Sequence, residues 1–351
     1  MLLEGLQLPL TTPFYLDGRL NLRKLEHNVE RYSKTPVAGL VALSETGESS
    51  LLSDEENRQV LRAAIDAAAV EKVMIAGVSR DSVLGTLELA EYAAGAGYDA
   101  VLVREPSFFR GGSRGSFRGN KAKELLTYFQ AVADRSSLPV VLDGAGAELA
   151  ADLVIELAGH PQIIGLVEGG FGSRRLEILK AGTASVKRSV TVTAMFAAAT
   201  GRMLGRSEGS GDFISSATLT VGGAAVAAPK VAVKTRTKVV GFQILAGKTA
   251  GMLDALLAGA VGAVPAFSAA APQACYEVFA AWKDGDEGLA REKQARLQVV
   301  AERVEVELGV PCIKFGCDLN GYFGGLPRLP LLPPTGDERS EIQALMQGLR
   351  N

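Results

Sequence analysis

The chain has 351 residues, of which 47% are apolar and 22% charged, and its formal net charge is −2. A chain of this length and apolar content can bury one large core or two smaller ones, and its nearly balanced charge gives no sign of a nucleic-acid partner. Three cysteines are too few, and odd in number, for a disulfide framework, and two histidines offer little for a zinc site.

No segment of the sequence predicts export or a membrane span. The first ten residues, "MLLEGLQLPL", carry an acid and a glycine where a signal peptide needs a basic end followed by an unbroken apolar stretch. The one long uncharged run, residues 255–276, is built largely of Ala and Gly and contains Pro265 and Pro272, which favours a helix followed by a strand. We therefore expect a cytoplasmic protein with no membrane partner.

Short apolar runs alternate with longer amphipathic stretches along most of the chain. The second helix has the clearest start, because Ser53 and Glu56 form a capping box ahead of the periodic apolar residues Val60, Leu61 and Ile65. The strands that we predict span residues 6–12, 39–44, 72–78, 100–105, 139–143, 163–168, 241–247 and 262–267.

Eight such strand and helix pairs predict a closed parallel (β/α)8 barrel over residues 1–275. In this fold the side chains that act on a substrate lie where the strands end and the following loops begin. Residues 276–351 have a helical pattern, with "EGLAREKQARLQVVAERVEVELG" as the clearest helix. We expect this C-terminal extension to pack on the outside of the barrel.

About residues 185–240 interrupt the alternation, since a connection from a helix to the next strand usually needs only about two to six residues. Within this insertion, "ATLTV" and "KVAVKTRTKVV" alternate strictly and predict a β-hairpin or arm. The second stretch has a basic face, which could bind an anion or nucleic acid, although charges on an edge strand more often prevent aggregation. The insertion follows a helix and therefore emerges at the face of the barrel opposite the carboxyl ends of the strands, where a substrate would bind. We therefore expect the insertion to have a role in packing or assembly. The two faces consist of Lys230, Lys234, Arg236 and Lys238 on one side and Val231, Val233 and Val239 on the other.

The strand ends also resemble a known family. The matching stretches, in chain order, are "LPLTTPF", "GLVALSETGESSLLSDEE", "VMIAGVSRDS", "AGAGYDAVLVREPSFF", "LPVVLDGAG", "HPQIIGLVEGG", "QILAGKTAGMLDALLAGAVGAVPAFSAAAPQ" and "LPRLPLLPP". Together they are similar to the dihydrodipicolinate synthase and N-acetylneuraminate lyase family of class I aldolases. The resemblance implies a (β/α)8 barrel with C-terminal helices, a homo-dimer or homo-tetramer, and the making or breaking of a bond next to a pyruvate-like carbonyl.

The chemistry that the resemblance implies needs a lysine at the end of the sixth strand, because only an amine condenses with a ketone to give an imine. The family pattern there resembles "IVGIKE", whereas this chain reads "IIGLVEGG", with Val167 in place of the lysine. Valine cannot form an imine. We therefore expect the standard pyruvate Schiff-base chemistry to be absent.

Other positions also differ from the family pattern. Asp143 stands where the family has a proton-relay tyrosine, and Glu45 stands within the loop that grips the substrate carboxylate. Glu148 occupies the place of an arginine in synthase members, and Phe108 that of an aromatic hydroxyl. These changes remove positive and donor groups and add acids, so we expect a pocket that disfavours anions and binds pyruvate poorly.

Several acids and loop residues fall near the strand ends. Glu48 and Glu168 stand at positions where the family pattern also has acids. We expect both carboxylates to accept hydrogen bonds from loop N–H groups. Cys312 and Cys317 fit no metal or exchange motif and predict two buried thiols. The residues that we expect to meet a substrate are Ser44, Thr46, Gly47, Glu48, Glu105, Glu148 and Glu168.

Two other groups could take over the chemical role of the missing lysine. Glu45, Glu105 and Asp143 could hold a divalent cation that polarises a carbonyl, or they could be solvated loop acids. Alternatively Lys248, at the end of the seventh strand where the family has an acid, could supply the amine. Because lysines at strand ends more often form ion pairs, we expect Asp143 or Glu168 to bind it.

Two classes of function follow from these residues. The first is an enzyme of lyase lineage with altered chemistry, with Asp143, Glu45 and Lys248 as its candidate catalytic residues and a small carbonyl-containing molecule as its partner. The second is a catalytically silent barrel used for ligand binding or assembly, whose mouth need not be open. We expect no cofactor in either case. We also expect removal of residues 205–238 to alter assembly or solubility.

Overall fold

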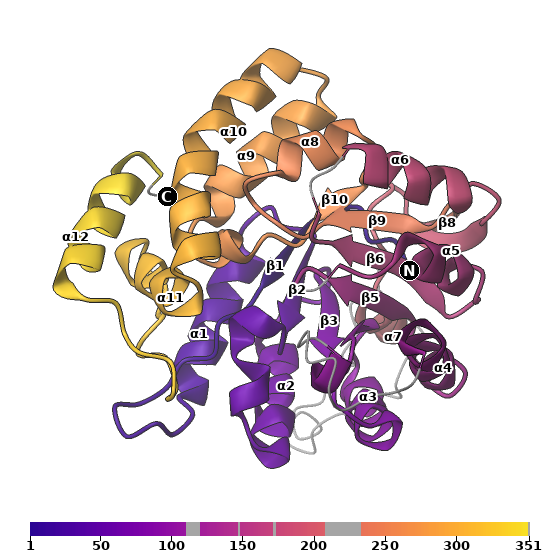
Figure 1. Ribbon diagram of the computed structural model, residues 1–351, viewed down its shortest axis with the longest axis horizontal. Coiled ribbons are helices and arrows are strands. Elements are labelled where there is room, and N and C mark those ends of the chain that lie inside the picture. Colours follow the sequence, from indigo (N-terminus) through magenta and orange to yellow (C-terminus); the bar gives the residue numbers. More distant parts are fainter. Residues whose placement is uncertain (110–119, 147, 171–172, 208–232, 350–351) are drawn as a thin grey trace, which may run out of the picture.

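The computed structural model of the protein describes residues 1–109, 120–146, 148–170, 173–207 and 233–349. Eight parallel strands close into a barrel in the order β1-β10-β9-β6-β5-β4-β3-β2, and Figure 1 shows helices surrounding it. The predicted (β/α)8 barrel is confirmed. The eight barrel strands are β1 (Gly5–Pro9), β2 (Gly39–Ala42), β3 (Val73–Gly77), β4 (Ala100–Arg104), β5 (Val140–Gly144), β6 (Ile163–Glu168), β9 (Gln243–Ala246) and β10 (Gly262–Ala263).

The barrel strands coincide with the eight predicted ranges, although most are shorter at their ends. The capping box predicted for the second helix is present, because Ser53 Oγ accepts from Glu56 N and Glu56 accepts from Ser53 N. The helices that flank the barrel are α1 (Leu22–Ser33), α2 (Asp54–Ala67), α3 (Val83–Ala96), α4 (Lys121–Ala133), α5 (Ala151–Ala158), α6 (Ser173–Gly182) and α8 (Met252–Leu257).

Two layers of apolar side chains stabilise the barrel. The inner layer fills its interior and includes Val41, Ile75, Val141 and Leu245. The outer layer packs the other face of each strand against the helices. Burial on both faces explains why these strands read as nearly continuous apolar runs.

The insertion forms an antiparallel pair of strands, β7 (Arg188–Thr193) and β8 (Thr235–Val240), with α7 (Gly201–Ser207) between them. It packs against Leu2 and the start of the chain, at the end of the barrel where the strands begin. The predicted strand "ATLTV", Lys230 and Val231 lie outside the described residues. The partner of β8 is therefore residues 188–193, which the sequence did not suggest.

The predicted orientation of β8 is inverted. Lys238 shares a face with Val190, which is buried, and its Nζ lies 2.8 Å from Glu4 Oε2. Val239, predicted to be on the buried face, is 63% exposed. The partner strand decides this outcome, because β7 contributes the valines that bury the shared face and Glu4 neutralises the lysine.

The C-terminal extension consists of α9 (Pro272–Lys283), α10 (Glu287–Ala301), a π-helical turn η6 (Glu302–Glu307), α11 (Val310–Leu319) and α12 (Gly336–Leu345). These helices gather on one side of the barrel (Figure 1). The extension lies outside the barrel, as predicted, and it also brings Glu305, Val310 and Ile313 to the barrel mouth.

Two further predictions concern the cysteines and the uncharged run. Cys275, Cys312 and Cys317 are free and buried, and burial raises the pKa of Cys312 to about 11. Residues 255–276 fold as the end of α8, then β10, then the start of α9. Within the described residues, no helix combines the length and apolar character that crossing a membrane requires.

Candidate functional site

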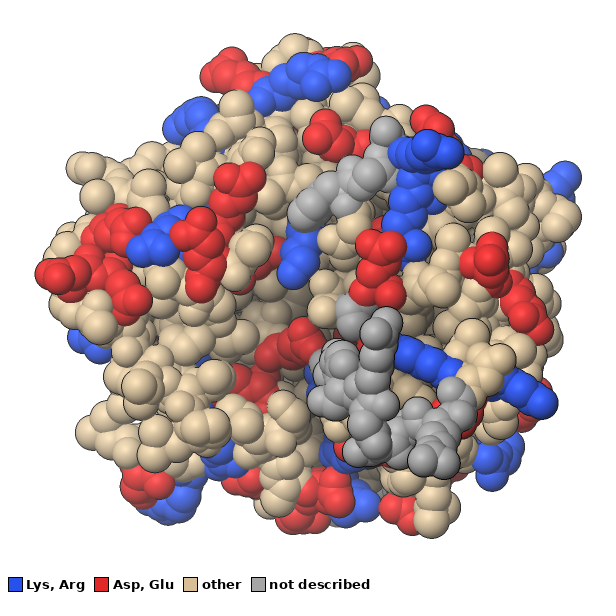
Figure 2. Space-filling model, viewed as in Figure 1, with Lys and Arg blue, Asp and Glu red and all other residues tan. Residues whose placement is uncertain are grey.

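A small pocket opens where the barrel strands end. Its volume is about 140 Å³, and Figure 2 shows a hollow near the centre of this face with acidic and basic side chains around it. Apolar residues and a few polar groups from separate loops line it, as is usual for ligand sites. The lining residues are Pro9, Ser44, Glu45, Thr46, Leu102, Asp143, Ala145, Val167, Gly247, Lys248, Val264, Ala266, Glu305, Gly309, Val310 and Ile313.

A second cavity, of about 360 Å³, lies between the loop after β1 and the C-terminal extension. Phe14, Phe315 and Phe323 are among its lining residues, and no strand-end residue of β2, β4, β5, β6 or β9 takes part. This second cavity is larger than the mouth pocket. The mouth pocket is nevertheless the better candidate for chemistry, because the polar groups at the strand ends converge there.

Val167 forms part of the pocket wall at the end of β6. It pairs in register with Asp143 of β5 and Leu245 of β9, and it is 2% exposed. The side chain therefore presents an apolar surface at the centre of the mouth, where the family resemblance implies an amine.

The loop after β2 brings Ser44, Thr46 and Gly47 to the mouth. Ser44 and Thr46 line the pocket, whereas Gly47 is buried behind it. Leu43 and Glu48, on either side of this loop, have φ angles of 60° and 57°. A non-glycine residue in this left-handed region is strained by about 1–3 kcal/mol and occurs preferentially at binding sites. The Oγ of Ser44 is buried and has no hydrogen-bond partner among the described residues.

The three acids proposed as a metal site do not come together. Glu45 binds Arg104 at 3.2 Å, and the buried Glu105 binds Lys121 at 3.2 Å. Within the described parts of the chain, no three His, Cys, Asp or Glu side chains form a group that could hold a metal ion. Two members of this triad instead have cations of their own, Arg104 beside Glu45 and Lys121 beside Glu105.

Arg104 also changes the charge of the mouth. Glu45 was expected to be an uncompensated acid, but the guanidinium of Arg104 lies beside it, and that arginine side chain is only 15% exposed. The arginine could have been noticed, because it ends β4 directly before Glu105. Glu45 therefore repels an anion less strongly than the sequence suggested.

Asp143 ends β5 in the pocket wall and is 9% exposed. Its Oδ1 accepts a hydrogen bond from Ala145 N at 3.1 Å. This bond turns the carboxyl group toward the loop that follows β5. An acid therefore lies in the wall one strand away from Val167.

Lys248 follows β9 and lines the same pocket, half-buried. The ion pair expected with Asp143 or Glu168 does not form. Glu168 is held by Arg175 instead, and no acid in the described segments lies within 4.0 Å of the lysine Nζ. The ammonium group thus faces the pocket with no hydrogen-bond or ion-pair partner among the described residues.

The C-terminal extension holds the loop that carries Lys248. Glu305 accepts hydrogen bonds from the N–H and hydroxyl of Thr249 and from Phe267 N, while Gln294 donates to Thr249 O at 3.0 Å. Burial raises the pKa of the Glu305 carboxyl, and these hydrogen bonds and the charge of Lys248 oppose that effect. No sequence pattern indicated Glu305, because its position depends on the π-helical turn Glu302–Glu307.

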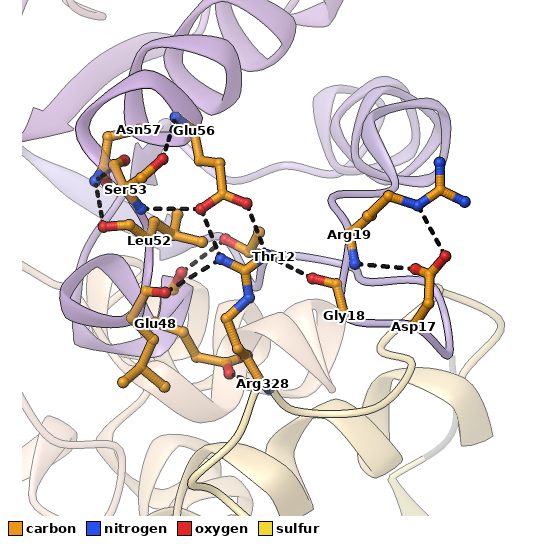
Figure 3. Close-up of polar contacts among 12 residues, drawn as sticks. Thr12, Asp17, Gly18, Arg19, Glu48, Leu52, Ser53, Glu56, Asn57 and Arg328 are labelled. Carbon is orange, nitrogen blue, oxygen red and sulfur yellow. Dashed lines mark hydrogen bonds and ion pairs between the residues drawn. The ribbon is translucent and has the colours of Figure 1, made fainter.

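Glu48 has a structural role behind the mouth. It is buried with Lys314 of α11, at 2.7 Å, and its Oε2 accepts from Arg328 N. Figure 3 shows Arg328 reaching from the segment before α12 to Glu48 and Glu56. Its guanidinium binds both carboxylate oxygens of Glu56 at 2.7 Å. Glu48 therefore joins the loop after β2 to the extension.

Glu168 and Glu148 share one cation on the opposite side of the mouth. Arg175 of α6 lies 2.9 Å from Glu168 and 3.1 Å from Glu148, and Glu168 also accepts from Gly170 N. Neither acid lines the pocket. The sequence argument overlooked Arg175, so the expected repulsion from Glu148 is compensated.

Phe108 lies outside the pocket. It belongs to a short 3-10 helix, Ser107–Phe109, and is 44% exposed. Its ring contacts that of Phe109, with 4.4 Å between centroids. Of the predicted site residues, the structure thus brings Ser44, Glu45, Thr46, Asp143, Val167 and Lys248 together, and it places Gly47, Glu48, Glu105, Phe108, Glu148 and Glu168 around them.

The closed barrel, the mouth pocket and the C-terminal helices define a barrel of the aldolase type. The family model for the dihydrodipicolinate synthetase family matches residues 2–185 and 223–349. The chain belongs to this family. The internal stretch that is not matched, 186–222, falls within the insertion between α6 and β9.

Curated relatives are similar over almost the whole chain. A 4-hydroxy-tetrahydrodipicolinate synthase of Acidiphilium cryptum is 26% identical, covering 99% of this chain and 98% of the relative. An L-threo-3-deoxy-hexylosonate aldolase of Hypocrea jecorina is also 26% identical, covering 99% and 95%.

Solved structures share the fold. A dihydrodipicolinate synthase of Bacillus anthracis superposes with a TM-score of 0.75 at 20% identity, covering 99% of both chains. A prophage protein of the dihydrodipicolinic acid synthase family from E. coli K12, solved in complex with pyruvate, has a TM-score of 0.73 at 24% identity and again covers 99% of both chains.

Proposed function

We propose that this chain is an enzyme of lyase lineage that acts on a small carbonyl compound in the mouth pocket without an imine at β6. The observation that carries the proposal is Val167 in the wall of an open pocket that Ser44, Asp143 and Lys248 also line. A catalytically silent barrel would not need to keep the buried Ser44 hydroxyl beside a cavity with no partner among the described residues, because burying such a group costs free energy.

The size of the pocket limits the ligand. A water molecule takes about 30 Å³ of liquid volume, so a cavity of about 140 Å³ has room for a ligand of roughly five heavy atoms. This is the size class of a three-carbon carbonyl compound.

The first test asks whether pyruvate forms an imine. The protein is incubated with pyruvate and borohydride, and its intact mass is measured. We expect no adduct on the natural chain, because no described lysine occupies the end of β6. The matched control is Val167→Lys, which restores an amine at that place and should gain the mass of one reduced pyruvate.

A pyruvate adduct on the natural chain would contradict the proposal, and peptide mapping would identify the modified lysine. An adduct confined to Val167→Lys would support both the placement of the lost lysine and the absence of the family's imine. If Val167→Lys fails to fold, a relative with the lysine serves as the positive control, and the result on the natural chain still decides.

A further inference from the structure

The second cavity, of about 360 Å³, shares no lining residue with the mouth pocket. It lies between the loop after β1 and the C-terminal extension, and Figure 1 shows α11 and α12 of that extension on the same side of the molecule as α1. The rings of Phe14, Phe315 and Phe323 line it together with three prolines. The chemistry proposed for the mouth uses none of these residues.

Two of the aromatic rings are held in place by other residues. Phe14 is 3% exposed, and Lys314 Nζ and Arg328 Cζ each lie 4.5 Å from the centre of its ring. Phe323 N donates to Asn28 Oδ1 at 2.8 Å, and Phe323 O accepts from Asn28 Nδ2 at 2.7 Å. Because these walls are already fixed, a ligand would bind here at little cost in conformational freedom.

One acid and one base line this cavity without binding each other. Asp318 of α11 accepts from Gly324 N at 2.8 Å and from Gly325 N at 3.4 Å, in both cases through Oδ1. Arg339 of α12 donates from Nε to Pro334 O at 3.1 Å. No acid of the described residues lies within 4.0 Å of its guanidinium nitrogens. The Oδ2 of Asp318 and the Nη groups of Arg339 therefore have no hydrogen-bond partner among the described residues.

The two charges are nevertheless near one another. Desolvation by the surrounding protein raises the pKa of the Asp318 carboxyl, and the charge of Arg339 is among the effects that oppose this rise. The Arg339 guanidinium also lies over the Phe315 ring, 5.7 Å from its centre. An acceptor and a donor thus stand beside the same apolar wall without forming an ion pair.

The size and the charges of the cavity indicate its ligand. Since a water molecule takes about 30 Å³ of liquid volume, 360 Å³ has room for about twelve heavy atoms. An ammonium group would bind the Asp318 carboxylate, and a carboxylate group would bind the Arg339 guanidinium. An aromatic or large apolar body would contact the phenylalanine rings. A free α-amino acid carries all three groups, and phenylalanine is of this size.

A ligand with only one of the two charges fits less well. A monocarboxylate would bind Arg339 but bring a like charge close to Asp318, and a monoamine would bind Asp318 but bring a like charge close to Arg339. The end of a peptide chain has the same fault, because only one of its two backbone groups is charged. The paired charges therefore favour a free amino acid.

We propose that this cavity binds a free α-amino acid with an aromatic or large apolar side chain, with Asp318 holding its ammonium group and Arg339 its carboxylate. The site goes beyond the proposed function and does not depend on it, because the two pockets have no lining residue in common. The amino acid would connect α11 to α12 and stabilise the folded chain by mass action.

The experiment measures the binding of phenylalanine to the full-length protein by isothermal titration calorimetry. Two analogues test the charges, since phenethylamine lacks the carboxylate and hydrocinnamate lacks the ammonium group. We expect saturable binding of phenylalanine, and binding at least about tenfold weaker for each analogue, because each loses a charge-assisted hydrogen bond. Glycine, which has no apolar side chain, should bind more weakly than phenylalanine as well.

Variants assign the two contacts. Asp318→Asn keeps an acceptor for Gly324 N but loses the charge, so it should weaken phenylalanine binding about tenfold or more and leave hydrocinnamate binding unchanged or tighter. Arg339→Gln should weaken phenylalanine binding to a similar extent and leave phenethylamine binding unchanged or tighter. The matched control is Arg291→Gln, which removes an arginine from an exposed ion pair with Glu287 on α10 and should bind phenylalanine like the natural chain.

Three results would overturn the inference. They are no saturable binding of phenylalanine, equal affinity for phenylalanine and its two analogues, and unchanged phenylalanine binding in either charge variant. If Asp318→Asn does not fold, Arg339→Gln on the exposed part of α12 decides, because unchanged binding there contradicts the carboxylate contact. A pyruvate adduct in the mass measurement would remove the proposed function and leave this inference standing.

Discussion

Two polar groups of the mouth pocket differ from the acids on the rim of the barrel mouth in whether another side chain binds them. On the rim, Glu48 is matched by Lys314 and Glu168 by Arg175. Inside the pocket, the Ser44 hydroxyl and the Lys248 ammonium have no such partner in the described regions. Two regions of one mouth, built from the same strand ends, therefore differ in whether the protein itself satisfies its polar side chains.

This difference separates structural acids from candidate functional groups. A buried charge that loses its partner is strongly destabilising, so the rim pairs must stay intact for the barrel to hold its shape. A buried donor left unpartnered at a cavity costs folding free energy, and a ligand that accepts its hydrogen bond would offset that cost. Substitutions on the rim should consequently change stability, and substitutions in the pocket should change ligand chemistry.

The largest effect is expected at Lys314. Its side chain is fully buried and donates to Glu48 and to the carbonyl groups of Thr12 and Leu326. Lys314→Met leaves the Glu48 carboxylate buried without its cation, which should lower the free energy of unfolding by about 3–5 kcal/mol. Urea unfolding followed by circular dichroism measures this loss.

The control for this prediction is a double variant. Lys314→Met combined with Glu48→Gln removes both charges and should recover part of the lost stability, because no buried charge is left alone. Equal losses in the single and double variants would show that packing, and not the ion pair, holds the extension to the loop after β2.

A smaller effect is expected at Arg328, and it depends on pH. The hydrogen bonds from Arg328 lower the pKa of Glu56 to about 2. Because the folded pKa lies below the ordinary value of 4.5, this pair stabilises the fold above about pH 4.5, and the contribution is lost as the pH falls toward 2. Arg328→Gln should cost about 1–2 kcal/mol at pH 7 and less at pH 3.

Unfolding midpoints at several pH values test this prediction. The matched control is Arg62→Gln, which removes an arginine from an exposed pair with Asp66 on α2 and should change stability by less than about 1 kcal/mol. If the difference between Arg328→Gln and the natural chain is the same at pH 7 and pH 3, Glu56 is not the group that responds.

The fold could be predicted from the sequence because its signals are local and repeated. Each barrel strand is an apolar run followed by an amphipathic helix, and eight repeats leave few other architectures. The orientation of β8 could not be predicted, because it depends on Val190 of a partner strand that the sequence did not suggest and on Glu4, more than two hundred residues away.

Of the candidate site, only the residues at the strand ends could be placed from the sequence. Val167, Asp143 and Lys248 lie where their positions in the sequence placed them. The partners of the acids could not be assigned, because Arg104 and Arg175 are separated in sequence from Glu45 and Glu148 and meet them only after folding. Glu305 enters the mouth from a helix that the sequence placed outside the barrel.

The smallest effect on stability is expected for the pocket hydroxyl of Ser44. Its Oγ is buried without a partner in the described structure, whereas the buried Thr12 hydroxyl donates to Gly47 O at 2.7 Å. Thr12→Val removes a hydrogen bond and should cost about 1 kcal/mol. Ser44→Ala removes an unsatisfied group, so its free energy of unfolding should stay the same or rise by up to about 1 kcal/mol. Urea unfolding of the two variants under the same conditions compares the partnered hydroxyl of Thr12, which binds the loop after β2, with the unpartnered hydroxyl of Ser44 in that loop. A loss at Ser44 as large as that at Thr12 would mean that the protein already satisfies this hydroxyl, and the contrast between rim and pocket would then not hold at this residue.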